Sequence, residues 1–179
     1  MENQDAVSRV RAGDTEAFAQ IVEQFQLPII RYLYRMTGDD ELARDLAQDT
    51  FVQAYKGLAK TTPDLPLKTW LYRIATNNAL QHRRRKRLIS FLPFNADTDS
   101  KEDMARAGDA DTDRLAVVES LLKIPEKLRV CMVLHFIDGF KYREIAETLG
   151  ISEDAVRMRV ARGSDEFRRL YGAAGGDER

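Results

Sequence analysis

Residues 140–171 carry the clearest structural pattern of the chain, FKYREIAETLGISEDAVRMRVARGSDEFRRLY. Its first part places apolar residues three and four positions apart, as one face of a helix requires. Gly150 ends that helix, because glycine tolerates the positive φ of a helix terminus. Ser152 is a suitable N-cap for a second helix, since its hydroxyl can accept a hydrogen bond from a free backbone N–H. The pattern therefore predicts two helices joined by a tight turn.

The second of these helices has an apolar face and a basic face. Its inner positions are Val156, Val160, Gly163 and Phe167. Its outer and flanking positions are Arg157, Met158, Arg159 and Arg162. A small packed helix followed by an arginine-bearing one is the helix-turn-helix arrangement, whose second helix enters the major groove of DNA. An ordinary helical hairpin with a solvated basic face is the alternative that this stretch alone leaves open.

Length and composition favour an all-α protein. The chain has 179 residues, of which 44% are hydrophobic and 32% charged, with few Gly and Pro and little strand-like alternation. Its apolar runs fall short of the roughly 18 residues that a membrane span needs, and the N-terminal stretch lacks the apolar core of a signal peptide. We therefore expect a cytoplasmic protein without membrane insertion.

Charge is unevenly distributed along the chain. Residues 1–95 carry 14 Lys/Arg and 11 Asp/Glu, residues 96–114 carry 3 and 7, and residues 115–179 carry 11 and 11. The acidic stretch has no periodicity, so it is predicted to be a flexible linker between two small helical domains. The expected limits are 1–92 for the first domain, 93–112 for the linker, 113–172 for the second domain and 173–179 for a disordered tail.

The chain offers little for metal or covalent chemistry. Cys131, the single cysteine, lies in an apolar run and is predicted to be a buried thiol. With only His82 and His135 beside it, a zinc site is not expected. The chain has no phosphate-cradling glycine loop and no nucleophile motif. We therefore predict no catalytic residue, no metal and no cofactor, and a helical enzyme is a weak alternative.

Three helices are predicted before residue 59. A short one at 5–12 ends at Gly13, and a second begins after Asp14 and contains Pro28, where a kink or break is expected. The third runs from about Asp40 to Leu58. Its periodicity places Tyr55 inward, and its polar, mildly acidic outer face carries Asp45, Gln48, Asp49 and Val52. Such a face is most simply a solvated surface.

A fourth helix is predicted from about Leu67, after a loop with two prolines. Thr69, Tyr72, Arg73, Thr76, Asn77 and Leu80 are expected to face outward or to flank its inner side. The helix leads into five consecutive cations at 83–87, which repel one another and indicate an anionic partner. An exposed aromatic ring, amides and cations suit single-stranded nucleic acid, because bases stack on rings while cations follow phosphates. A solubilising tract is the alternative.

In this order and spacing, the segments resemble the extracytoplasmic-function (ECF) sigma factors, the small two-domain initiation subunits of bacterial RNA polymerase. The matching segments are GDTEAFAQIVEQF, ARDLAQDTFVQAY, WLYRIATNNAL with its basic extension, and IPEKLRVCMVLHFIDGFKYREIAETLGIS. The resemblance covers roughly residues 5–171. It implies a sigma2 domain that binds the polymerase clamp and opens the −10 promoter element. It also implies a sigma4 domain that reads the −35 element as duplex and sits on the polymerase flap.

The resemblance further implies roles for individual residues. The clamp-binding surface would be Asp45, Gln48, Asp49 and Val52. The −10 surface would be Lys60, Lys68, Tyr72, Arg73, Thr76, Asn77, Arg83, Arg84 and Arg85. The −35 surface would be Arg157, Met158, Arg159 and Arg162, with Lys141 and Arg143 at phosphates. The implied partners are core RNA polymerase, promoter DNA and an anti-sigma factor.

One departure from the family pattern lies at the entry to the recognition helix. The family usually has a Pro-x-Gly-Thr type of entry, whereas this chain has Ser152-Glu153-Asp154-Ala155. Two acids at this end repel phosphates unless they point aside or read a base.

The alternative function is a free-standing helix-turn-helix regulator that binds operator DNA as a dimer. It would need a dimerisation helix or a sensor domain, and the N-terminal block shows neither clearly.

Overall fold

The computed structural model describes residues 2–60, 65–90 and 109–174, and every regular element within these ranges is a helix. The elements are α1 (Glu2–Arg11), α2 (Thr15–Thr37), α3 (Asp40–Leu58), α4 (Leu67–Ser90), α5 (Asp109–Lys123), α6 (Glu126–Met132), the π-helical turn η1 (Val133–Ile137), α7 (Tyr142–Leu149) and α8 (Glu153–Ala174). The all-α prediction is confirmed. Among the helices of these ranges, none is long and apolar enough to cross a membrane.

Local capping sets the limits of α2 and α3 where the sequence predicted them. The Asp14 carboxylate accepts a hydrogen bond from the backbone N–H of Ala17 at 3.0 Å. Gly38, with φ of 76°, ends α2 in the left-handed conformation. Asp39 then caps α3 by accepting from the N–H of Leu42 at 2.9 Å. These short-range interactions orient the two helices as an antiparallel pair.

Of the kink or break expected at Pro28, a break does not occur, because helix α2 continues through that residue. Proline costs a helix one backbone hydrogen bond and crowds the preceding turn. Here Phe25 and Ile29, on either side of Pro28, are both buried in the core. Packing along the whole apolar face therefore outweighs the local cost.

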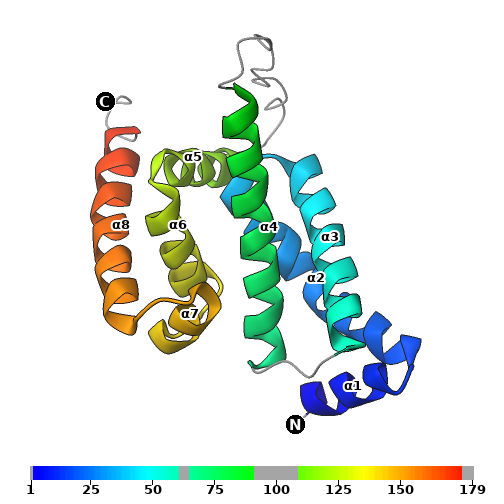
Figure 1. Cartoon of the computed structure of the whole chain (residues 1–179). Coiled ribbons are helices and arrows are strands. Elements are labelled where there is room, and N and C mark those ends of the chain that lie inside the picture. The colour runs from blue at the N-terminus through cyan, green and yellow to red at the C-terminus, as the bar shows by residue number, and fades with distance from the viewer. Residues whose placement is uncertain (1, 61–64, 91–108, 175–179) are drawn as a thin grey trace.

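Helix α4 occupies the middle of the molecule, with α2 and α3 on one side and α6 and α7 on the other (Figure 1). Helix α5 packs on α2, where Leu122 lies so close to Gly38 that a Cβ atom there would clash. Buried residues of both halves, such as Leu33 and Leu134, belong to one continuous apolar core. The two halves are thus packed against each other, an arrangement that the sequence did not predict.

The helix-turn-helix forms as predicted. Gly150 has φ of 65° and ends α7, and the Ser152 hydroxyl accepts from the N–H of Ala155 at 3.2 Å. Val156 and Val160 are buried on the inner face of α8.

Two element limits differ from the expectation. Helix α5 begins at Asp109, within the stretch assigned to the linker, and α8 extends to Ala174, within the predicted tail. The remainder of the predicted linker, 93–108, and of the predicted tail, 175–179, lies outside the described residues.

Candidate functional site

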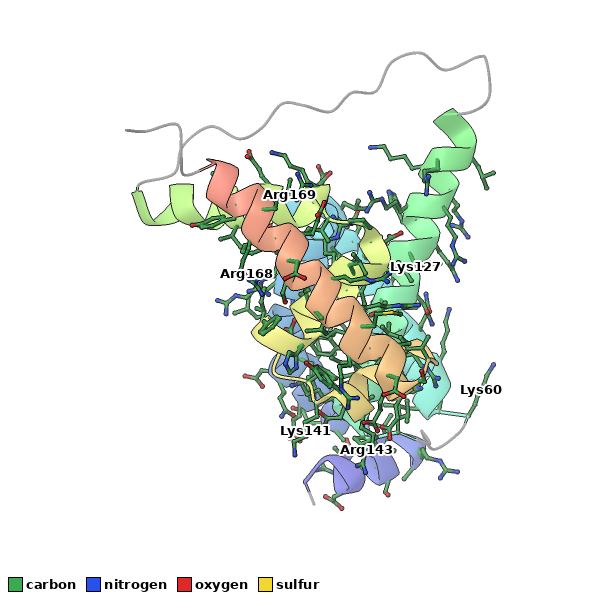
Figure 2. All side chains as sticks on the ribbon, turned by 90° about the vertical axis from the view of Figure 1, so that its left-hand side faces the viewer. Lys60, Lys127, Lys141, Arg143, Arg168 and Arg169 are labelled. Atoms are coloured by element: carbon green, nitrogen blue, oxygen red, sulfur yellow. The ribbon has the colours of Figure 1, made fainter. Side chains whose placement is uncertain are left out.

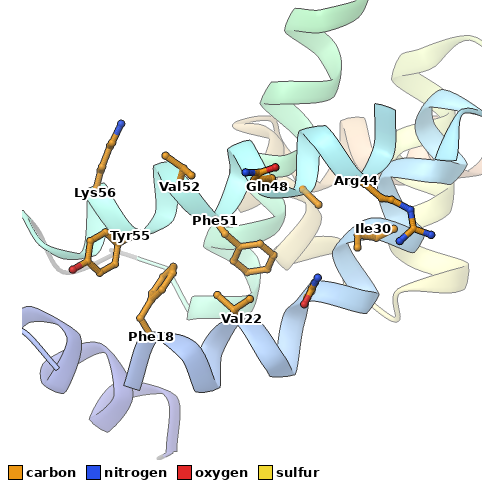
Figure 3. Close-up of a pocket in the computed structure, with 11 residues that line it drawn as sticks. Phe18, Val22, Ile30, Arg44, Gln48, Phe51, Val52, Tyr55 and Lys56 are labelled. Atoms are coloured by element: carbon orange, nitrogen blue, oxygen red, sulfur yellow. The ribbon is translucent and has the colours of Figure 1, made fainter. Parts of the chain in front are cut away.

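The outer face of α3 borders an apolar groove. Asp45, Gln48, Asp49 and Val52 are all exposed, as predicted. The groove runs between α2 and α3 and has a volume of about 550 Å³ (Figure 3). Its apolar wall is formed by Phe18, Val22 and Ile30 of α2 and by Phe51, Val52 and Tyr55 of α3. The groove could not be predicted from the pattern of α3 alone, because half of the wall comes from another helix.

Tyr55 lies at this groove and not in the core. It is 41% exposed, and its ring meets that of Phe18 edge to face at 5.0 Å. Arg44 and Lys56 also line the groove, together with the polar Gln26 and Gln48. The groove therefore combines an apolar wall with cationic and amide groups.

The structure exposes most residues of the predicted −10 surface and buries the others. Lys60, Lys68, Asn77, Arg83, Arg84 and Arg85 are exposed, and Arg73 is half-buried. Tyr72 and Thr76, however, are each only 1% exposed, so the expectation that they face outward is wrong. Thr69, which was also expected outside, is buried as well. The reason is tertiary, because both α2 and the C-terminal half pack on α4: Tyr32 of α2 contacts Thr76 and Tyr72, and Asp138 and Phe140 contact Tyr72.

Tyr72 is held by a chain of hydrogen bonds and ring contacts. Its hydroxyl donates to Asp138 Oδ1 at 2.9 Å. Its ring lies 4.8 Å from Phe140 and 5.1 Å from Tyr32. Thr76 Oγ1 donates to the carbonyl oxygen of Tyr72 and is bonded to the Tyr32 hydroxyl, each at 2.7 Å. Burial raises the pKa of both tyrosines, so both hydroxyls stay protonated at neutral pH.

The basic end of α4 also reaches the C-terminal half. Arg83 forms an ion pair with Glu126 of α6, at 3.9 Å between Nη1 and Oε1. The neighbouring Arg84 and Arg85 are exposed. A polar contact deeper in the first half joins α3 to α4, since Asn78 donates to Thr50 at 3.1 Å and accepts from Gln53 at 3.0 Å.

The predicted −35 residues lie along α7 and the first half of α8. Met158 is 49% exposed, Arg157 and Arg162 are exposed, and Arg159 is half-buried. Asp154 pairs with Arg157 at 3.0 Å. One acid of the unusual helix entry is thereby directed along the helix and partly neutralised.

Further cations lie at both ends of this face (Figure 2). Lys141 and Arg143 lie at one end, and Arg143 pairs with Glu147 at 3.6 Å. Arg168 and Arg169 lie toward the other end of α8. They pair with Asp165 and Glu166, one turn earlier on the same helix.

Two charged residues were missed by the sequence reasoning. Arg129 is 0% exposed, and its Nη1 donates a long hydrogen bond of 3.4 Å to the carbonyl oxygen of Leu121. Its Nε and Nη2 have no hydrogen-bond partner in the described part of the chain, and neither has Asp138 Oδ2. Burial lowers the pKa of Arg129 to about 10 and raises that of Asp138. Arg129 lies one helical turn before the inner residue Val133, a spacing that signals its burial.

Metal-binding side chains are not clustered in the ranges that the structure covers. No group of three or more His, Cys, Asp or Glu residues there lies close enough to hold an ion. Cys131 is fully buried, as predicted, and burial raises the pKa of its thiol.

Comparison with known proteins places this geometry in a class. The family model of sigma-70 region 2 matches residues 21–89, and that of sigma-70 region 4 matches residues 114–165. The fold and its surfaces thus define a sigma-70-type transcription initiation factor. The chain is 32% identical to the ECF RNA polymerase sigma factor SigW of Bacillus subtilis over 176 residues, covering 91% of this chain and 93% of SigW. It is 33% identical to the RNA polymerase sigma-H factor of Pseudomonas aeruginosa, covering 90% and 89%. The chain therefore belongs to the ECF RNA polymerase sigma factors, which confirms the predicted resemblance.

Solved structures share the fold. The structure of CnrH in complex with the cytosolic domain of CnrY is 26% identical, has a TM-score of 0.76 and matches 97% of this chain and 99% of that chain. The sigma factor RpoE, in complex with the anti-sigma factor NepR from Bartonella quintana, is 21% identical and has a TM-score of 0.71, with 90% and 98% covered. The second likeness concerns the fold alone.

Proposed function

We propose that this sigma factor joins core RNA polymerase through the groove between α2 and α3, reads the −35 element with α8 and opens the −10 element with α4. The observation that carries the proposal is the helix-turn-helix. Its second helix buries Val156 and Val160 and turns Arg157, Met158 and Arg162 to the solvent. A helix held in this way can enter a major groove without losing its packing.

Contacts to the −35 duplex divide by chemistry. Arg162 can donate two hydrogen bonds to guanine, whereas Met158 offers only apolar contact, for which a thymine methyl group is the natural match. Arg157 is shared with Asp154, so part of its charge is already neutralised. Lys141 and Arg143 flank the helix, where phosphates would pass.

The polymerase contact combines apolar and charged parts. The groove wall around Phe18, Phe51 and Tyr55 can receive the apolar face of a helix from the clamp. Asp45 and Asp49 lie exposed on the adjoining face of α3. Apolar burial supplies affinity, and the surrounding charges set orientation and association rate.

Regulation by an anti-sigma factor is part of the proposal. Two similar folds were solved with a partner, CnrH with the cytosolic domain of CnrY and RpoE with the anti-sigma factor NepR. A partner that covers the α2–α3 groove, α8 or both would block assembly with polymerase.

We further propose that the protein works in the cytoplasm by binding and strand separation, without covalent catalysis.

Run-off transcription with core RNA polymerase on a promoter library tests the proposal. The expected result is transcription from a subset of promoters that share −35 and −10 sequences, with none from core polymerase alone. The competing function is that of a free-standing operator-binding regulator. A dimer in gel filtration that binds duplex DNA but does not bind core polymerase would support that alternative and overturn the proposal.

A further inference from the structure

Part of the α4 face assigned to the −10 element, around Tyr72 and Lys68, is contacted by the chain's own turn between η1 and α7. Tyr72 donates a hydrogen bond to Asp138 Oδ1, and Lys68 Nζ donates one to the backbone carbonyl oxygen of Asp138, each at 2.9 Å. Phe140 lies against the same two residues, with its ring 4.8 Å from that of Tyr72 and 4.4 Å from Lys68 Nζ. Asp138 and Phe140, on either side of Gly139, thus engage an aromatic ring and a cation expected to meet DNA.

These contacts use the chemistry that single-stranded DNA would use. A base stacks on an exposed ring, and here the Phe140 ring lies against Tyr72 at an interplanar angle of 57°, so it occupies the position beside the ring without being stacked on it. A phosphate or base oxygen accepts a hydrogen bond from a lysine or a hydroxyl. Here the backbone carbonyl oxygen of Asp138 accepts from Lys68, and the side-chain oxygen Oδ1 of Asp138 accepts from Tyr72. We propose that residues 138–140 are an intramolecular mask that competes with single-stranded DNA for Lys68 and Tyr72. This inference rests on the proposed −10 role of α4.

Buried polar atoms without hydrogen-bond partners destabilise the closed arrangement of the mask. Asp138 Oδ2 is buried without a hydrogen-bond partner in the described part of the chain. Arg129 carries two more such atoms, and its electrostatic neighbours include Arg83 of α4 and Tyr32 of α2, so this charge lies where the two halves meet. Each buried polar atom without a partner raises the free energy of the closed arrangement. Separation of the turn from α4 would let water reach Asp138 Oδ2.

The test compares two substitutions at the same position in the full chain. Asp138→Asn keeps an oxygen that can accept from Tyr72, whereas Asp138→Ala does not. Both remove the same negative charge, so any general electrostatic gain in DNA affinity is equal in the two variants. The probe is a fluorescein-labelled, 20-nucleotide single-stranded DNA of random sequence, followed by fluorescence anisotropy. If the Ala variant does not fold, Asp138→Ser, whose side chain is too short to reach Tyr72, takes its place.

The expected result follows from the open fraction. Apparent affinity scales with the fraction of molecules that expose the site. Losing one such hydrogen bond multiplies that fraction about fivefold, so Asp138→Ala should bind the probe about fivefold tighter than Asp138→Asn. Equal affinities would overturn the mask, and weaker binding by Asp138→Ala would instead make Asp138 a support of the DNA surface.

A parallel assay separates this inference from the proposed function. Run-off transcription by the wild-type chain tests the sigma factor role without reference to the mask. If the wild-type chain transcribes but no form binds the probe, single-strand binding by α4 and the mask both fail, and the promoter-directed role stands. If the Ala-to-Asn ratio is as expected, the mask stands.

Discussion

Replacing Arg129 by methionine should stabilise the protein. Arg129 is 0% exposed, its Nη1 makes one long hydrogen bond, and its other two nitrogens have no hydrogen-bond partner among the residues that the structure describes. Burial lowers its pKa to about 10. At about 1.4 kcal/mol for each pKa unit, the folded state disfavours the charged form by roughly 3 kcal/mol. Methionine has a similar length and no charge, so Arg129→Met should raise the free energy of unfolding by about 1 to 3 kcal/mol.

Urea or thermal unfolding followed by circular dichroism measures this change. For a chain of this size, each kcal/mol shifts the melting temperature by about 2–4 °C. The matched control is Lys127→Met on the same helix, where the side chain is exposed and the change should stay within about 0.5 kcal/mol. A loss of 1 kcal/mol or more in Arg129→Met would refute the reasoning, because it would mean that the guanidinium is well satisfied in the folded protein.

Three other variants test the polymerase-binding face, the −35 face and the pH response of Asp138. Asp49→Arg should weaken co-purification with core polymerase and leave melting nearly unchanged, because Asp49 is exposed on α3. Arg162→Ala should weaken holoenzyme binding to a −35 duplex by roughly 1–3 kcal/mol if Arg162 reads a base, or flatten the salt dependence if it touches phosphate. Because burial raises the pKa of Asp138, the closed arrangement takes up a proton, so acidification should compact the chain and Asp138→Asn should flatten this response in small-angle scattering.

Each of these has a control and an outcome that counts against it. Glu119→Arg on α5 makes the same charge change as Asp49→Arg. If the two variants bind polymerase with equal affinity, the α3 face is a solvated surface and does not contact polymerase. Arg168→Ala removes a like charge from the far end of α8, and an equal loss there would deny Arg162 a special role.

For the pH response, the groups facing Asp138 are Tyr72 and Lys68 of α4 and Arg35 of α2. The contact is fully stabilised below the ordinary carboxyl range and weakens as pH rises through the raised pKa. Expansion on acidification would contradict the assigned direction.

The helices, their caps, the helix-turn-helix and the family could all be predicted from the amino-acid sequence. These features are encoded over a few residues: a 3.6-residue apolar period, an acidic or hydroxyl side chain at an N-cap, and glycine where φ is positive. Asp14, Gly38 and Gly150 act within one or two turns of their own position. A single sequence therefore predicts them without knowledge of distant contacts.

Which faces of those helices stay exposed depends on tertiary packing, which the sequence pattern does not report. Tyr72 lies outside the inner face of its own helix, and its burial depends on Asp138, 66 positions away in the chain. The groove between α2 and α3 likewise needs Phe18 and Tyr55 together. Periodicity reports where a helix has an apolar side, but not which distant segment covers the other side. That choice depends on the packing of the two halves, including buried polar groups such as Arg129 whose cost only the assembled core reveals.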